Sequence, residues 1–299
     1  MSVLDSFAAE VGPAGAGPVV AVGGRTRWDV GGAPRAATRE VRAPTGVVDH
    51  EPAEMTVRVL AGTPVDELQA ALAASGQRVL LPSWPGATVG GVLAVGASGV
   101  ERLGWGPLRN VALEIRYASA DGDTVTAGGP TVKNVSGYDL PRLLVGSLGT
   151  LGLFAESILR TAPLPLAVQW FASRDVDPFG LRDLLHDPVA ILWDGGCTWV
   201  LFEGHPRDVE AQALAAGLAG TEVGGPPELP PHRWSVCPGE LRTIDPRPGP
   251  FVAELGVGVV HRDDPQPARP LDPPLAALNA RVKAAFDPTG RLGPGRELR

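Results

Sequence analysis

The sequence predicts an α+β protein built from two units that each mix helices with strands. Short apolar or alternating runs typical of strands are interspersed with segments of helical periodicity, and the texture of the chain changes after Pro165. The 299 residues suffice for two compact domains, or one large one, and 44% of them are apolar. Glycine and proline are unusually frequent, but without a period and interrupted by apolar segments, which excludes collagen and argues against disorder.

In the first unit, Pro18–Gly24 is expected to form a buried strand that ends in a tight glycine turn. Thr63 is expected to cap a helix that has Pro64 at its first position and ends at Gly76. Asp121-Gly122 predicts a hairpin between strands at 111–118 and 124–127. Further strands are expected at 56–60 and 151–160.

The second unit is expected to follow Pro165, with two Pro-rich connectors at 224–231 and 263–274. Its expected strands are 167–173, 190–193, 199–203 and 251–261, and its expected helices are 179–186 and 208–220. A final helix should begin at Pro273 with Asp272 as its cap and end before Asp287-Pro288. Its apolar residues should form one stripe: Leu275, Leu278, Val282 and Phe286.

Charge and cysteine usage exclude several classes of protein. The net charge of −7 offers no general attraction for nucleic acid or anionic lipid. Cys197 and Cys237 are too few for a disulfide framework or an iron–sulfur cluster. Residues 1–17 lack the pattern of a signal peptide, and the uncharged stretch 79–100 contains too many glycines and prolines for a membrane span. We therefore expect a cytoplasmic protein without direct membrane insertion, and association with a membrane through partners stays open.

Common catalytic motifs are missing from the sequence. It contains no Gly-Lys-Ser/Thr phosphate loop, no strand leading into a G-x-G-x-x-G helix, no H-E-x-x-H, no C-x-x-C and no G-x-S-x-G. The five histidines show no metal-ligand spacing, so no metal site is predicted. Only Lys133 and Lys283 are lysines, and a lysine in such an arginine-rich chain is expected where a compact ammonium is needed.

Three glycine-rich patches each adjoin an expected strand, at 22–28, 85–99 and 146–154. The first can direct successive backbone N–H groups at a phosphate, with a hydroxyl from Thr26 and charge from Arg25 or Arg27. The second lets a backbone lie against a flat ligand. Each patch also has a purely structural alternative: a hairpin turn at 22–28, a tight contact between helices at 85–99 and a glycine-rich turn at 146–154. Three such patches in one half favour a large ligand that carries phosphate.

Five motifs in the correct order carry a family resemblance. They are the loop 23–32, 85–91, 132–140, 146–152 and the tail 283–295. The sequence resembles the flavin domain of the vanillyl-alcohol-oxidase/p-cresol-methylhydroxylase (PCMH) type over about residues 18–163 and 275–295. More narrowly, it is similar to the FAD-binding subunit of bacterial glycolate oxidase.

The resemblance implies a PCMH-type FAD-binding domain of two subdomains at 1–165 and a smaller α+β cap domain at 166–270. A C-terminal helix and tail at 271–299 would return to the FAD domain. The cofactor is expected to be non-covalent FAD, because the loop 23–32 has no His or Cys for covalent attachment. Two departures concern the loop and the tail: Arg25 stands where relatives often have a third glycine, and Gly293 where many have Asn.

The resemblance assigns the diphosphate loop to Gly23–Thr26, a second lining loop to residues 85–99, and the adenosine end to residues 149–153. Arg109 and Lys133 are candidates to stabilise negative charge on the reduced flavin, with structural ion pairs as the alternative. The expected cofactor-binding residues are Gly23, Gly24, Arg25, Thr26, Arg27, Pro85, Gly86, Thr88, Gly90, Gly91, Ser98, Gly99, Arg109, Lys133, Gly149, Thr150, Gly152 and Leu153. No catalytic residue is predicted.

The implied function is that of an FAD-binding subunit in a glycolate oxidase-like complex that oxidises a 2-hydroxyacid. A catalytic flavin subunit and an iron–sulfur subunit would be its partners. The Gly-Asp-Gly-Asn-x-His metal motif of larger relatives is absent, which favours an accessory FAD-binding subunit without independent catalysis. A stand-alone flavin oxidase acting on another alcohol stays open. The flavin subunit of a molybdenum hydroxylase is disfavoured by the motif 133–139 and by the tail.

Overall fold

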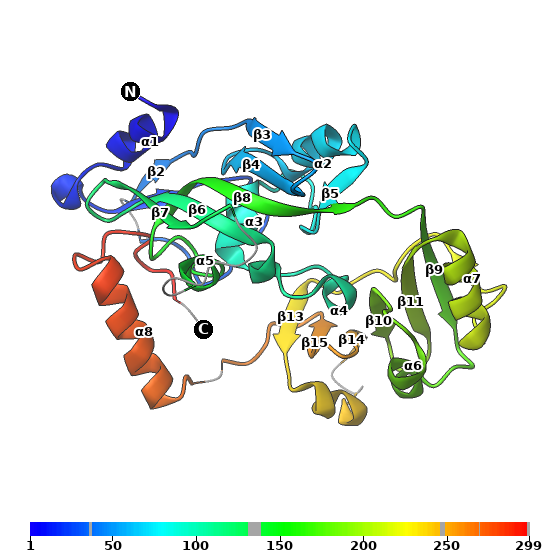
Figure 1. Ribbon diagram of the computed structural model, residues 1–299. Helices are drawn as coiled ribbons and strands as arrows, with labels where there is room; N and C mark the ends of the chain where they lie inside the picture. Colours follow the sequence, from blue (N-terminus) through cyan, green and yellow to red (C-terminus); the bar gives the residue numbers. More distant parts are fainter. Residues whose placement is uncertain (36–37, 131–138, 246–248, 269, 298–299) are drawn as a thin grey trace. The chain divides into compact units, whose positions relative to one another are not determined.

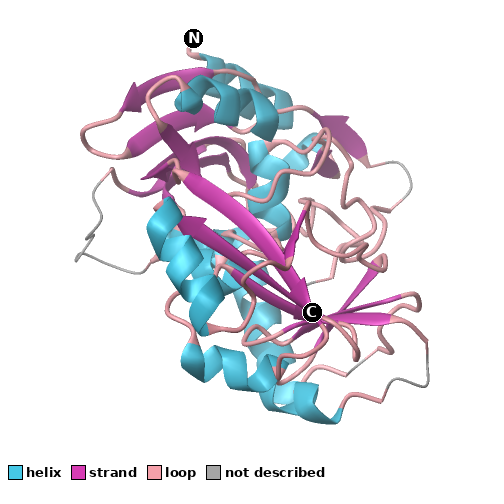
Figure 2. Ribbon diagram, turned by 90° about the vertical axis from the view of Figure 1, so that its right-hand side faces the viewer, coloured by secondary structure: helices cyan, strands magenta, loops and turns pink. Residues whose placement is uncertain are grey.

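The computed structural model describes residues 1–35, 38–130, 139–245, 249–268 and 270–297. The chain divides into two compact units. The first comprises Met1–Ser98, Pro107–Leu164 and Pro270–Arg299, and the second comprises Gly99–Gly106 and Pro165–Arg269. Helices and strands occur in both (Figure 1 and Figure 2). The predicted α+β class is confirmed, and the transfer of the short stretch 99–106 to the second unit is a feature that the sequence did not indicate.

The main sheet of the first unit is antiparallel, in the order β3-β4-β8-β6-β7, with β5 also paired to β8. Its strands are β3 (Val47–Glu51), β4 (Thr56–Leu60), β5 (Gln77–Val79), β6 (Ala112–Ala118), β7 (Thr124–Gly128) and β8 (Leu153–Pro163). Because β8 lies between β4 and β6, its first seven residues are all buried. The predicted hairpin is confirmed: β6 pairs with β7, and Gly122 in the turn has a φ of 83°. A separate pair, β1 (Val19–Ala21) and β2 (Arg39–Val41), is parallel.

The helices that pack on this sheet are α1 (Val3–Val11), α2 (Val65–Ala73), α3 (Val89–Val95) and α5 (Leu140–Leu144). Helix α8 (Pro273–Phe286) belongs to the same unit and is drawn apart from the sheet in Figure 1. Leu68 and Leu72 of α2 and Leu93 of α3 are fully buried in one core with Ile115 and Leu159 of the sheet. Burial of each of these side chains stabilises the fold by roughly 1.5–3 kcal/mol.

The start of α2 differs from the prediction, because Thr63 is not its cap. The Thr63 side chain donates to the carbonyl of Leu60 at 2.7 Å and accepts from the N–H of Gly46 at 2.8 Å. The fully buried hydroxyl is therefore occupied by neighbouring loops, and Pro64 precedes α2 without a side-chain cap. Asp272 likewise makes no capping hydrogen bond at the start of α8.

The second unit has one sheet of seven strands in the order β12-β9-β11-β10-β14-β15-β13. The strands are β9 (Ala167–Ser173), β10 (Ala190–Trp193), β11 (Thr198–Gly204), β12 (Glu222–Val223), β13 (His232–Ser235), β14 (Phe251–Glu254) and β15 (Val259–Arg262). Helix α7 (Pro206–Ala215) lies along β9 and β11, and α6 (Pro178–Leu184) packs beside β10 (Figure 1). The unit also contains the short helix α4 (Arg102–Trp105).

The single strand predicted at 251–261 is wrong. The segment forms an antiparallel pair, β14 and β15, whose turn contains Gly256 at φ 77° and Gly258 at φ 83°. Positive φ is readily adopted by glycine, so two glycines in an otherwise apolar run reverse the chain. Strand β13 was not predicted, because it directly follows a Pro-rich connector and is only four residues long.

A polar anchor fixes the segment after α8 to the body of the first unit. Lys283 Nζ donates to Asp287 Oδ2 at 2.6 Å, to the Thr150 carbonyl at 2.7 Å and to the Leu292 carbonyl at 3.0 Å. The buried Arg291 guanidinium donates to four carbonyls, those of Val11, Gly12, Gly17 and Ala120. The three N–H donors of the Lys283 ammonium are therefore all used. This agrees with the expectation that lysine occurs in this arginine-rich chain where a compact ammonium is needed.

Helix α8 itself packs less than predicted. Val282 and Phe286 pack against the core, whereas Leu275 and Leu278 are 46% and 50% exposed. The expected single apolar stripe is therefore covered only at its C-terminal end, and the anchor rather than the stripe holds the helix to its unit.

Replacing Lys283 by arginine is expected to lower the free energy of unfolding by about 1.5–3 kcal/mol, the range for hydrogen bonds to a charged group. A planar guanidinium cannot place three donors around the point that one ammonium occupies. Urea denaturation measures the change, with Arg281→Lys on the exposed side of α8 as the matched control. An unchanged midpoint for Lys283→Arg would show that the anchor tolerates either cation.

The stability of the protein is also expected to depend on the protonation of Asp287. Burial raises the pKa of its carboxyl, but hydrogen bonds from Lys283 and from the N–H groups of Leu292 and Arg291 outweigh burial and set the pKa below 3.8. The ionised form therefore stabilises the fold above that pH, and this contribution is lost as the pH falls through the folded-state pKa. Asp287→Asn should be less stable than the wild type near neutral pH, and the gap should close in acid. A gap independent of pH contradicts this assignment.

Candidate functional site

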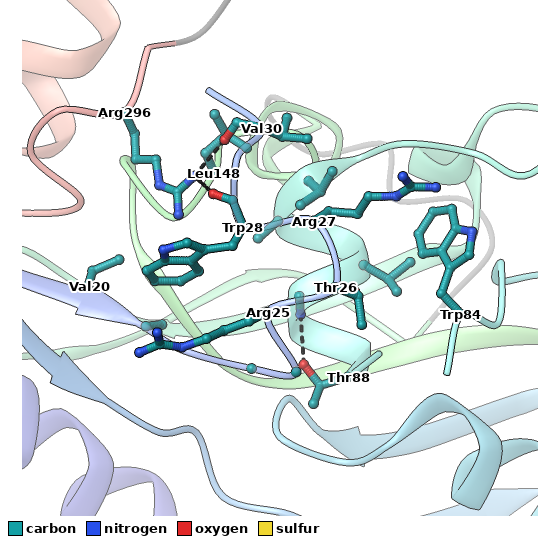
Figure 3. A pocket seen from close by; sticks show the side chains of 17 residues that line it. Val20, Arg25, Thr26, Arg27, Trp28, Val30, Trp84, Thr88, Leu148 and Arg296 are labelled. Carbon is teal, nitrogen blue, oxygen red and sulfur yellow. Dashed lines mark hydrogen bonds between the residues drawn. The ribbon is translucent and has the colours of Figure 1, made fainter. Parts of the chain in front are cut away.

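Two adjoining cavities lie in the first unit, with empty volumes of about 610 and 470 Å³. Figure 3 shows the larger, cavity 1. The smaller, cavity 2, shares part of the lining of cavity 1, namely Ala21, Gly23, Thr88, Gly91, Ala94 and Leu148. The two cavities are therefore neighbouring chambers around the same loops.

The structure brings most of the predicted loop residues to these chambers. Cavity 1 is lined, among others, by Gly23, Gly24, Arg25, Thr26, Arg27, Thr88 and Gly91. Cavity 2 is lined, among others, by Gly23, Thr88, Gly90, Gly91, Gly149 and Leu153. Three stretches that are distant in sequence thus meet at one place, as a large ligand requires.

The turn after β1 presents unused backbone donors to the cavities. Within the described part of the chain, the N–H groups of Gly23, Gly24, Arg25 and Thr26 donate no hydrogen bond, whereas the N–H of Val22 still bonds the carbonyl of Val41 at 2.8 Å. Arg25 has a φ of 57°, the left-handed conformation in which a glycine would be unstrained. Successive free N–H groups at such a turn form a nest for an anionic oxygen.

The glycines of this turn are required by the protein's own packing. A Cβ at residue 24 would overlap the Gly86 carbonyl, and a Cβ at residue 23 would overlap the Thr88 hydroxyl. At Gly90, a Cβ would lie 2.8 Å from the Ala61 side chain. The missing side chains therefore let the first loop lie directly on the second one, with the free N–H groups left at the cavity.

The start of helix α3 offers no comparable donors. The N–H groups of Val89, Gly90 and Val92 bond the carbonyls of Thr63, Ala61 and Thr88 at 2.7–2.9 Å. The N–H of Gly91 bonds the Thr88 hydroxyl at 3.3 Å. The unpaired N–H groups at the cavities thus belong to the loop 23–26 rather than to this helix end.

The arginines at cavity 1 differ in how far their charge is neutralised. Arg25 pairs with Glu40 at 2.6 Å. Arg27 lies over the ring of Trp84 at 4.6 Å and forms no ion pair with any described carboxylate. Cavity 1 therefore retains positive charge that is available to an anionic ligand.

Ten lining residues of cavity 1 were not among those predicted from the sequence, among them Trp28, Trp84, Leu148 and Arg296. Trp28 and Leu148 fall inside motifs that the sequence reveals, but only the glycines and polar residues beside them carry a recognisable signal. The N–H of Leu148 bonds the Ala94 carbonyl at 2.8 Å, which fixes this side chain between the chambers. Arg296 follows the tail motif directly, and only the folded chain shows that it returns to the loop 23–30.

Other predicted residues do not line either chamber. Arg109 is exposed in the short 3-10 helix η2 (Leu108–Asn110), and Gly99 belongs to the second unit. Thr150 donates to the Ser147 carbonyl, and a Cβ on Gly152 would overlap the Tyr117 ring. Pro85, Gly86 and the buried Ser98 support the second loop without lining a cavity. Lys133 lies outside the described residues, so its role stays a prediction.

Neither a metal site nor a membrane-spanning helix occurs among the described residues. They contain no group of three or more His, Cys, Asp or Glu side chains placed to hold a metal ion. In the same part of the chain, the helices are all too short or too polar to cross a lipid bilayer.

Comparisons with known proteins agree with this geometry. Residues 14–128 match the family model described as FAD binding domain. Glycolate oxidase subunit GlcE of Escherichia coli (strain K12) is 28% identical over 330 residues, which cover 93% of this chain and 92% of that protein. Glycolate oxidase subunit GlcD of Bacillus subtilis (strain 168) is 40% identical over 78 residues, which cover 26% of this chain and 17% of that protein. D-lactate dehydrogenase of Archaeoglobus fulgidus is 46% identical over 85 residues, 27% of this chain and 19% of that protein.

Among solved structures, alkyldihydroxyacetonephosphate synthase aligns with 97% of this chain and 73% of its own, with a TM-score of 0.69 at 14% identity. This likeness shows the fold alone and confirms the predicted PCMH-type architecture. The resemblance inferred from the sequence is confirmed as well: residues 14–128 match the model of an FAD binding domain, and the chain is similar over nearly its whole length to a subunit of glycolate oxidase.

Proposed function

We propose that this chain is the FAD-binding subunit of a glycolate oxidase-like complex that oxidises a 2-hydroxyacid and passes electrons to a partner subunit. The observation that carries the proposal is the row of unpaired N–H groups at Gly23–Thr26, next to a cavity with unneutralised arginine. Backbone donors and guanidinium groups together suit the diphosphate of FAD. Two relatives of similar sequence are named as glycolate oxidase subunits, which supports membership in a complex.

The two cavities differ in the chemistry of their linings and would therefore hold different parts of FAD. The described residues that line cavity 2 are all uncharged, among them Ala43, Gly62 and Phe154, and suit a flat neutral ring. Cavity 1 carries the arginines and the two tryptophans. Gly23 and Gly91 line both, so the diphosphate belongs at the loop between the chambers. Bound FAD supplies a two-electron acceptor for oxidation of an alcohol carbon.

The lining of the chambers favours the accessory version of this function. The described residues that line them include no His, Cys, Asp, Glu, Lys or Tyr, so none of these side chains can take a proton from a substrate hydroxyl there. In this version the chain holds FAD and relays electrons, while a catalytic flavin subunit removes them from the substrate. An iron–sulfur partner belongs to the proposal because Cys197 and Cys237 cannot hold a cluster. The cytoplasmic location stays a prediction.

The purified chain is expected to bind FAD, which is detected by its absorbance at about 450 nm. Acid precipitation should release the flavin unmodified, because the loop 23–32 offers no His or Cys for a covalent bond. In the accessory version, glycolate or D-lactate bleaches the flavin only after partner subunits are added. Bleaching of the isolated chain would establish independent catalysis, and a chain that takes up no FAD would refute the proposed function.

The substitution Gly91→Leu, which would place a side chain in the cavities, is expected to reduce FAD affinity at least tenfold without unfolding the apoprotein. A Cβ at this position meets only the Thr88 hydroxyl, at 3.0 Å, so the side chain of Gly91→Leu extends into open space. The control is Gly224→Leu, on an exposed glycine of the second unit with nothing nearby. Gly24→Ala should instead lower the thermal midpoint of the apoprotein, because its Cβ overlaps the Gly86 carbonyl. Full FAD affinity in Gly91→Leu would remove the chambers from the binding site.

A further inference from the structure

We propose that Arg296, on the C-terminal tail, is an anion-binding residue of this site, and that it fixes the loop 26–30 while supplying positive charge to the diphosphate of the dinucleotide. The inference rests on the proposed function, since it takes FAD as the ligand of cavity 1. It adds a residue from the far end of the chain to a site that was otherwise assigned to glycine-rich loops.

The tail lies along the outer side of the loop through backbone hydrogen bonds. The Pro294 carbonyl accepts from the N–H of Arg35, and the N–H of Glu297 donates to the Gly31 carbonyl, both at 2.8 Å. A Cβ at Gly295 would lie 2.7 Å from the Ala33 carbonyl, so the two segments are in close contact. The anchor at Lys283, Asp287 and Arg291 holds the base of the tail. The tail therefore delivers Arg296 to a fixed position.

The guanidinium of Arg296 holds the loop in two ways (Figure 3). Its Nη1 donates to the carbonyls of Trp28 and Val30, the latter at 2.6 Å. Its centre lies 4.5 Å from the centroid of the Trp28 ring, and the guanidinium of Arg25 lies 4.8 Å from the same ring. In Figure 3 the two arginines lie on opposite sides of the Trp28 side chain. The indole thus lies between two cations, and cation–π attraction holds both of them against its ring.

The charge of Arg296 remains available to a ligand. Arg25 is neutralised by Glu40 at 2.6 Å, whereas Arg296 forms no ion pair with any described carboxylate. Its Nε and Nη2 donate no hydrogen bond to the described residues, although the side chain lines cavity 1. Burial lowers the pKa of Arg296, with Asp29 acting in the opposite direction, but an arginine stays protonated at neutral pH. Two free donors on a positioned planar cation match the oxygens of a phosphate.

The test compares Arg296→Gln and Arg296→Lys with Arg281→Gln, which removes an exposed arginine from α8. Binding of FAD, ADP and riboflavin is followed by isothermal titration at several sodium chloride concentrations, together with the thermal midpoint of each apoprotein. Arg296→Gln should weaken FAD and ADP binding tenfold or more at low salt and flatten its salt dependence, since one charge pair is lost. Riboflavin, which has no phosphate, should bind unchanged. Arg296→Lys should keep the salt dependence, and Arg281→Gln should match the wild type.

Each outcome separates this inference from the proposed function. A wild type that binds neither FAD nor ADP refutes the function itself. A wild type that binds both, with equal affinity in Arg296→Gln, refutes only the role of Arg296. Weaker binding in Arg296→Gln with unchanged salt dependence, or an equal loss for riboflavin, would show that Arg296 supports the loop without meeting the phosphates, and would also overturn the inference.

Discussion

The backbone of Gly24 lies directly against that of Gly86 and Ala87, and Gly23 lies against the Thr88 side chain, so neither position has room for a side chain. Because one face of the turn is used for packing, its N–H groups remain unpaired on the other face, where both cavities open. The glycines thus contribute to the candidate site indirectly. Because they have no side chains, the two loops approach closely, and this arrangement leaves the N–H groups unpaired beside the cavities.

Sequence patterns predicted the elements that depend on local chemistry. The turn at Asp121-Gly122 and the strands β9 and β10 follow from residue type and alternation, and the structure has them where expected. The patterns failed where a tertiary partner decided the outcome. The hydroxyl of Thr63 was free to cap a helix in the sequence, yet in the folded chain it satisfies Gly46 and Leu60. Gly256 and Gly258 turned an apparently continuous strand into a hairpin.

The candidate site shows the same difference between residues that have a local sequence signal and residues that only tertiary contacts bring to it. Glycine-rich loops indicate a large ligand that carries phosphate by their composition, so Gly23–Thr26 and Thr88–Gly91 could be selected from the sequence alone. Arg296 could not, because a single arginine near the end of an arginine-rich chain carries no local signal. Arg25 departs from a glycine that is common in relatives, and its φ of 57° shows that the loop keeps the glycine-like conformation. Its charge, however, is directed to Glu40.

Arg291 joins the carbonyls of Val11, Gly12 and Ala120 to a segment that is translated after the second unit. Residues 165–269 of the second unit separate this segment from the rest of the first unit. While they are translated on the ribosome, the nascent chain already contains strands β1–β8 but lacks the side chain that ties Val11, Gly12 and Ala120 together. The second unit can fold during that interval, whereas the packing of the first unit is completed only after residue 291 has been made.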